Sequence, residues 1–226
     1  MPHSLLLEVC AFNVPSCIIA EQAGAGRIEL CAGASLGGIT PAIETIREVK
    51  EKVSIPVYPM IRPRGGNFLY SAGEISIMKQ DIATCWSLGC EGIATGVQLP
   101  DGSIDIELLK RIVEWAYPMK VTCHRVFDRT PDPFKALEDI ISSGCGRILT
   151  SGQKNTAIEA TGLLAELADA AAGRIIIMPG GGVRSTNIDQ LIAETHAFEF
   201  HTSALISGET ADEAELRKII TALQPV

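Results

Sequence analysis

Short apolar runs alternate with amphipathic stretches along the whole chain. The apolar runs are rich in Ile and lack strict polar alternation, which is typical of parallel strands covered on both faces. Glycine precedes such a run in a degenerate repeat that occurs four times, as AGAGRIEL from Ala23, LGCEGIATG from Leu88, SGCGRILTSG from Ser143 and AAGRIIIMPGG from Ala171. Because glycine readily forms the left-handed cap that ends a helix, the repeat predicts helix ends followed by buried strands.

The same pattern predicts eight strands, each followed by a helix. We expect the strands near 5–11, 27–31, 56–62, 92–96, 120–126, 147–151, 174–178 and 197–202. Helix starts are indicated at Thr40-Pro41, Asp132-Pro133 and Asn187, each ahead of apolar residues spaced three to four apart. Eight such units favour a closed (β/α)8 barrel of the TIM type.

A doubly wound open sheet also alternates strands and helices, but it normally carries a glycine-rich phosphate-binding turn after its first strand. Here the first strand runs into CAFNVPS instead. The chain has 226 residues, a length that suits one barrel, and it shows no linker or low-complexity segment. We therefore expect a single domain over residues 1–226.

Charge and hydropathy limit the partners that we expect. The net charge is −8, from 19 Lys and Arg against 27 Asp and Glu, which disfavours nucleic acid and anionic membrane surfaces. No apolar run approaches the roughly 20 residues that span a bilayer, and the start of the chain does not resemble a secretory signal. We expect a cytoplasmic location.

Polar residues recur at the predicted carboxyl ends of the strands. In a barrel, alternate strand residues point inward, and those at the carboxyl end line the mouth where active sites form. Ion pairs, for example between Glu8 or Glu29 and Arg62, could simply hold the fold together. Burying many charges is costly unless they are paired, so the whole set favours a polar pocket. The inward residues predicted by this parity are Glu8, Cys10, Glu29, Cys31, Met60, Arg62, Thr122, His124, Glu199 and His201.

A second set of residues favours a small anionic ligand. Two arginines in MIRPRGGNFLY offer fork-shaped donors for carboxylate or phosphate. Glycine turns after the sixth and seventh strands could present backbone N–H groups where phosphate sites of such barrels often lie. Glycine runs also form simple turns, and the arginine segment could be a solvated loop. The residues predicted to bind the anion are Arg62, Arg64, Ser151, Gly152, Gly180, Gly181 and His201.

His124, in CHRVFD, is the candidate for acid–base catalysis, because histidine titrates near neutral pH. Glu8 or Glu29 could orient its ring, and the catalytic set is then His124, Glu8 and Glu29. A histidine at a strand end can equally be structural, and the same alternative applies to His201.

The seven cysteines include no Cys-x-x-Cys pair, which argues for free thiols and against a zinc ribbon. Four of them fall on predicted helices or helix caps and are interpreted as packing residues: Cys17, Cys85, Cys90 and Cys145. Cys10 and Cys31 share the inward face of neighbouring strands. Their sulfurs could approach each other and bind a soft ion such as Cu(I), although each alone could also be a packing residue.

Several segments together resemble the CutC family, which is named for copper homeostasis. They are LLEVC, GAGRIELCAG followed by GGITP, PVYPMIRPRGGNFLY, GIATGVQLPDG, HRVFD, RILTSGQK and GGGVR. The resemblance implies a (β/α)8 barrel and a role in cytosolic copper handling. It also implies Cu(I) bound by the cysteines of the EVC and IELC motifs, here Cys10 and Cys31. A homodimer is the expected assembly.

Three hypotheses for function follow. The first is a copper-binding protein with Cys10 and Cys31 as ligands. The second is a metabolic enzyme that acts on a small phosphorylated or carboxylated compound, with Arg62 and Arg64 holding the anion and His124 paired with Glu8 or Glu29. The third is an interaction protein whose pocket has no function. Substitution at these residues separates the three hypotheses, because only the third predicts that every such substitution is tolerated.

Overall fold

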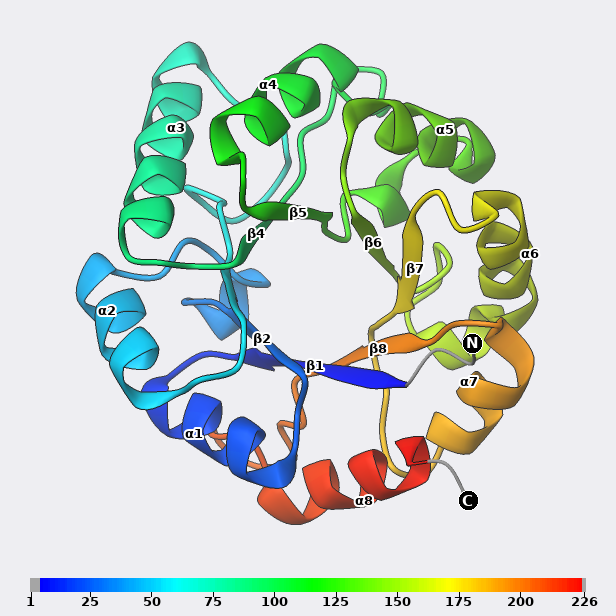
Figure 1. Cartoon of the computed structure of the whole chain (residues 1–226). Coiled ribbons are helices and arrows are strands. Elements are labelled where there is room, and N and C mark those ends of the chain that lie inside the picture. Colours follow the sequence, from blue (N-terminus) through cyan, green and yellow to red (C-terminus); the bar gives the residue numbers. More distant parts are fainter. Residues whose placement is uncertain (1–4, 225–226) are drawn as a thin grey trace.

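The computed structural model describes residues 5–224, which form a closed barrel of parallel strands surrounded by helices (Figure 1). The strands are β1 (Leu6–Ala11), β2 (Arg27–Leu30), β3 (Val57–Pro59), β4 (Gly92–Thr95), β5 (Lys120–Cys123), β6 (Arg147–Thr150), β7 (Ile176–Pro179) and β8 (Glu199–Thr202). The helices are α1 (Val14–Ala23), α2 (Ile43–Lys52), α3 (Ala72–Ser87), α4 (Ile106–Ala116), α5 (Pro133–Ser143), α6 (Thr161–Ala171), α7 (Ile188–Thr195) and α8 (Glu213–Leu223). Short 3-10 turns are η1 (Ala34–Leu36), η2 (Phe127–Arg129) and η3 (Ala157–Ala160). The predicted (β/α)8 barrel is confirmed.

Two ladders of four strands make up the barrel, in the orders β3-β2-β1-β8 and β4-β5-β6-β7. Single bridges join the ladders on both sides: Met60 pairs with Ala94, and Gly180 pairs with His201. Closure removes the free edges that an open sheet would expose. It also brings the carboxyl ends of all the strands to one mouth.

Several strands are shorter than the sequence pattern predicts. β3 ends at Pro59 and not at residue 62, and proline has no N–H to donate to a ladder. β5 ends at Cys123 and not at residue 126, because the chain turns there and the Val126 N–H bonds to the His124 ring. β7 begins at Ile176 and not at residue 174, because the Arg174 N–H closes a turn onto Ala171.

Only one of the three predicted helix starts has the expected cap. The Asp132 side chain accepts from the N–H groups of Phe134 and Lys135, with Pro133 in the first turn of α5. The Thr40 hydroxyl instead accepts the N–H of Arg62. The Asn187 side chain accepts the N–H of Arg184 and does not cap α7. These two polar side chains therefore tie loops together and do not start helices.

Most of the apolar core lies between the strands and the helices, where residues such as Val9, Ile28 and Ile93 are fully buried. A second, small cluster lies inside the barrel and consists of Cys10, Cys31, Met60 and Ala94, with Phe12 packed against it. Side chains fill the inside of such barrels, and here much of that filling is polar or charged. The interior is therefore the place to look for chemistry.

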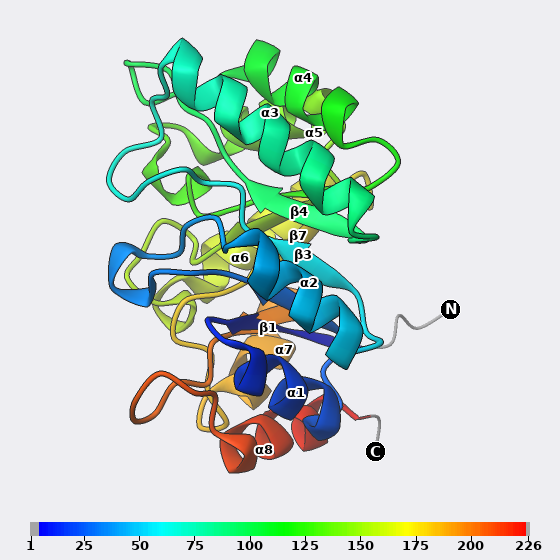
Figure 2. The ribbon, with the colours of Figure 1, turned by 90° about the vertical axis from the view of Figure 1, so that its left-hand side faces the viewer.

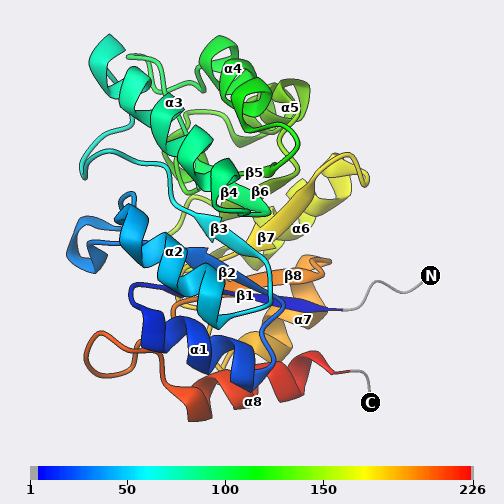
Figure 3. The ribbon, with the colours of Figure 1, turned by 60° about the vertical axis from the view of Figure 1, so that its left-hand side comes forward.

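The loops after β2, β3 and β8 project from the same end of the barrel, on the left in Figures 2 and 3. This is the carboxyl-terminal end of the strands, where the candidate residues gather. Within residues 5–224, none of the helices has the length and apolar character needed to cross a membrane.

We predict that Gly92→Ala destabilises the fold by about 2 kcal/mol, because overpacking a tight core typically costs that much. A Cβ at position 92 would lie 2.3 Å from Tyr58 Cζ and 2.7 Å from the Lys120 carbonyl oxygen. Urea unfolding measures the loss. The control is Gly162→Ala in α6, whose Cβ would meet no described atom within 4 Å, and which should be neutral or stabilising. Equal effects of the two substitutions would contradict the packing described here.

Candidate functional site

A network of ion pairs crosses the inside of the barrel. Glu199 accepts from Arg27 Nη2 at 2.5 Å and from Arg147 Nε and Nη2 at 2.6 and 3.1 Å. Arg27 Nε also pairs with Glu8. The guanidinium carbons of the two arginines lie 5.2 and 5.7 Å from the Tyr58 ring centre. All four charged side chains are buried, and each has an opposite charge in contact, as burial requires.

An ion pair of Glu8 or Glu29 with Arg62 was one possibility from the sequence; in the structure Glu8 pairs with Arg27. Arg27 and Arg147 were not among the predicted site residues, although strand parity places Arg27 on the same face as Glu29. Both stand in the Gly-Arg-Ile step of the repeat. The repeat by itself is not a sufficient signal, because Arg174 occupies the same step and pairs with Glu138 on the outside.

His201 lies between two carboxyl groups. Its Nδ1 is 2.7 Å from Glu8 Oε1, and its Nε2 is 3.7 Å from Glu29 Oε2. Burial opposes a charge on the ring, but the Glu29 carboxyl and hydrogen bonds to Cys10 and Glu8 raise the pKa of His201 well above its ordinary value. Burial likewise opposes ionisation of Glu8, but Arg27 and His201 lower the pKa of Glu8 to about 2. At neutral pH this pair is an imidazolium and a carboxylate.

The two predicted copper ligands lie next to this pair. The sulfurs of Cys10 and Cys31 are 3.8 Å apart, and Cys31 Sγ is 3.5 Å from Glu29 Oε2. The hydrogen bond between the sulfurs lowers the pKa of Cys10 to about 5 and raises the pKa of Cys31 well above its ordinary value. Burial and the nearby Cys10 raise the pKa of Glu29. Cys10 is therefore a thiolate beside the positive charge of His201.

Two overlapping groups of ligand atoms result, each within 4.8 Å of one another: Cys10, Glu29 and Cys31, and Glu8, Glu29 and His201. Met60 packs in the same interior cluster as the two cysteines. A thiolate, a thiol and a thioether are soft donors that suit Cu(I), whereas carboxylates favour harder ions. Met178, by contrast, places its sulfur 3.4 Å from Arg27 Nη2.

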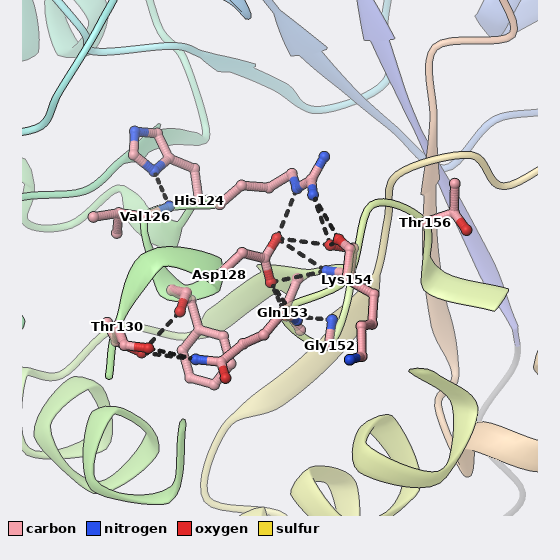
Figure 4. A network of polar contacts seen from close by, with 12 residues as sticks. His124, Val126, Asp128, Thr130, Gly152, Gln153, Lys154 and Thr156 are labelled. Carbon is pink, nitrogen blue, oxygen red and sulfur yellow. Dashed lines mark hydrogen bonds and ion pairs between the residues drawn. The ribbon is translucent and has the colours of Figure 1, made fainter. Parts of the chain in front are cut away.

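His124 lies apart from the carboxylates that were expected to orient it. β5 is across the barrel from β1 in Figure 1, and Glu8 and Glu29 face His201 instead. The ring of His124 is oriented by its own backbone, since Nδ1 accepts the Val126 N–H at 3.1 Å (Figure 4). Burial and the charge of Arg62 lower the pKa of His124 to about 3. The imidazole is therefore neutral, and its proton is on Nε2.

Arg62 and Arg64 bond mainly to loop carbonyls. Arg62 Nη1 donates to the carbonyls of residues 36, 37 and 38 at 2.8–3.2 Å, and Nη2 donates to Gly66 at 2.9 Å. Arg62 thus joins the loops after β2 and β3 while its charge stays in the mouth. Arg64 pairs with Glu74 at 2.6 Å and also donates to Leu69. The expectation that both arginines clamp an anion is corrected for Arg64, whose guanidinium bonds within its own loop and to the first turn of α3.

The turn after β6 already holds an anion of the chain itself. The Asp128 carboxylate accepts from the N–H groups of Ser151 and Gln153 at 3.1–3.2 Å (Figure 4). The Gly152 N–H donates to the Thr150 hydroxyl at 2.9 Å. The predicted anion site at Ser151 and Gly152 is therefore occupied by Asp128, a partner that the local sequence does not reveal.

The turn after β7 is also engaged with the chain. The Gly180 N–H donates to the Thr150 carbonyl, and the Gly181 carbonyl accepts from Ala157. A Cβ on Gly180 would lie 2.4 Å from Leu149, so glycine there permits close packing beside His201. These contacts account for both glycines structurally.

A cavity of about 130 Å³ lies in the mouth. It is lined by Cys10, Glu29, Gly37, Met60, Arg62, Phe68, His124, Arg125, Leu149 and His201. An outer groove of about 400 Å³ adjoins it and shares four of these residues, Gly37, Arg62, Phe68 and Arg125. The Cys10 thiol of β1, the His124 ring after β5 and the His201 ring of β8 thus meet around one space.

Comparison with known proteins identifies the family. The family model described as CutC matches residues 5–206. The chain belongs to the CutC family. A CutC protein from Parabacteroides distasonis is 50% identical over 202 residues, which cover 88% of this chain and 82% of that protein. The mouse copper homeostasis protein cutC homolog is 45% identical over 208 residues, 92% of this chain and 76% of the relative.

A solved CutC structure extends the comparison to three dimensions. The crystal structure of a Streptococcus agalactiae protein named as a copper homeostasis protein CutC superposes with a TM-score of 0.83. It is 33% identical and covers 88% of this chain and 98% of that one. The resemblance to the CutC family seen in the sequence is confirmed.

We predict that His124 makes this CutC-family fold sensitive to acid. Its pKa is about 3 in the folded chain and near 6.5 when unfolded, so the unfolded chain binds an extra proton between these values. The contribution of neutral His124 to the free energy of unfolding is complete above pH 6.5 and falls as the pH drops toward 3. From pH 7 to pH 5, the wild type should lose about 2 kcal/mol more unfolding free energy than His124→Gln. Urea unfolding at the two pH values measures both losses. Equal losses of unfolding free energy in the wild type and in His124→Gln would contradict the low pKa of His124.

Proposed function

We propose that this CutC-family chain binds Cu(I) through the sulfurs of Cys10 and Cys31 and acts in copper handling. The observation that carries the proposal is the pair of buried sulfurs at 3.8 Å, one of them a thiolate. The names of the mouse and human relatives, copper homeostasis protein cutC homolog, support the role.

The donor set fits a soft monovalent ion. Metal–thiolate bonds are about 2.3 Å long, so one ion can contact both sulfurs at their present separation with a bent geometry. A small increase in the distance between the two sulfurs would make the sulfur–copper–sulfur arrangement linear. Binding requires a second thiolate, and Cys31 must therefore release its proton when the ion enters. Met60, in the same cluster, offers a third soft atom.

The surrounding charges fit the same ion. Two thiolates and Cu(I) together carry one negative charge, and His201 beside Cys10 carries one positive charge. Glu8 fixes the His201 ring through Nδ1, and Arg27 fixes Glu8 in turn. Residues that contact the ligands, without binding the metal themselves, commonly tune metal affinity in this way. Cys10 and His201 both line the mouth cavity, which gives the ion a path to the site.

An anaerobic Cu(I) titration against a competing chelator tests the proposal. We expect one Cu(I) per wild-type chain, and a loss of affinity greater than about 100-fold in Cys10→Ala/Cys31→Ala, since even groups behind the ligands typically contribute 10- to 100-fold. The matched control is Cys90→Ala, which removes another buried thiol outside the mouth. Affinity that survives in the double variant, or that falls equally in the control, would refute this site.

A further inference from the structure

Three buried polar atoms of the mouth lack a hydrogen-bond partner within the described structure: His124 Nε2, Glu29 Oε1 and Arg62 Nε. All three residues line the 130 Å³ cavity, and all are almost fully buried, with exposed fractions of 4%, 3% and 4%. Buried polar groups nearly always have partners, and such exceptions need an explanation. The simplest explanation is a ligand that supplies the missing hydrogen bonds.

The role of His124 in such a contact is fixed by its backbone. Nδ1 accepts the Val126 N–H, so Nε2 carries the proton and can only donate. The Phe68 ring packs against the imidazole, with ring centres 4.8 Å apart, and holds its orientation. His124 therefore presents a fixed donor to the cavity, which calls for an oxygen acceptor on the ligand.

Positive charge gathers where the cavity opens. The outer groove is lined by Arg62, Arg125, Arg129 and Lys154, in a chain whose net charge is −8. Asp128 is the one carboxylate among the lining residues of this groove, and its oxygens are already bonded to the turn after β6 and to Arg125. The positive charge of the rim is thus only partly offset by the chain.

Two of these arginines lie against one aromatic ring. The guanidinium carbons of Arg62 and Arg129 are 4.8 and 4.7 Å from the Phe68 ring centre. Two like charges held by the same ring repel each other, and an anion between the rim and the cavity would relieve that repulsion. The nearby walls formed by Met60, Phe68 and Leu149 are apolar and suit a short carbon chain.

We propose that the cavity and its rim bind a small hydroxylated organic anion, a carboxylate or a phosphate ester. One ligand oxygen accepts the His124 Nε2–H, a ligand hydroxyl forms a hydrogen bond with Glu29 Oε1, and the anionic group lies among Arg62, Arg125 and Arg129. This site is independent of the copper proposal, because it requires neither sulfur as a ligand.

Calorimetric titration of the reduced, full-length chain with four probes tests the proposal: glycerol 3-phosphate, glycerate, glycerol and inorganic phosphate. The first two share a HOCH2–CHOH unit that carries either CH2–O–phosphate or a carboxylate, and they decide between a phosphate ester and a carboxylate. We expect one of them to bind at concentrations up to about 10 mM and glycerol not to bind. Inorganic phosphate should bind more weakly, because it cannot reach both His124 and the rim. No binding of either hydroxylated anion would overturn the proposal.

Substitutions locate the bound anion. Arg129→Gln at the rim and His124→Phe in the cavity should each weaken binding about tenfold, the loss typical of one charge-assisted hydrogen bond. The matched control is Arg111→Gln, because Arg111 also lies over an aromatic ring, 5.0 Å from Trp115, but on α4. If His124→Phe does not fold, Arg129→Gln decides alone. Affinity that is unchanged in Arg129→Gln, or reduced equally in Arg111→Gln, would overturn the proposed position.

Discussion

A charge buried inside a closed barrel needs an opposite charge or hydrogen-bond acceptors there, and this constraint organises the mouth. Glu199 lies between Arg27 and Arg147, and Arg27 reaches on to Glu8. Glu8 is thereby ionised and holds the His201 ring, which in turn stabilises the thiolate next to it. The reactivity of one sulfur thus rests on ion pairs several residues away. An aliphatic interior would give the same fold without this chemistry.

Strand periodicity was enough to predict the barrel and most of the inward residues, because alternation along a strand depends only on local geometry. It could not predict partners. Glu8 was expected near Arg62 or His124 and instead contacts Arg27 and His201. The turn at Ser151 was expected to bind a foreign anion, but Asp128 fills it. The predicted barrel already makes β1 a neighbour of β2 and β8. Which charged side chains then reach one another depends on strand register and side-chain conformation, and no local sequence pattern encodes these.

The mouth has two chemically different sides. β1, β2 and β8 contribute thiols, carboxyl groups and a charged histidine, whereas the segments after β3, β5 and β6 contribute arginines and a neutral histidine. The acidic side is balanced by buried arginines, whereas the basic side is only partly balanced by Asp128. One cavity connects the two sides. A soft metal ion and a small organic anion therefore suit different walls of the same space.

The central claim is that two sulfurs, and not the neighbouring carboxyl or imidazole groups, hold copper in this barrel. X-ray absorption spectroscopy of the Cu(I)-loaded chain tests it most directly, because the technique distinguishes sulfur from nitrogen and oxygen neighbours. The account predicts a first shell of sulfur atoms at about 2.3 Å or slightly less, with no nitrogen or oxygen at bonding distance. A first shell dominated by nitrogen or oxygen would place copper at His201 or the carboxylates and contradict the account.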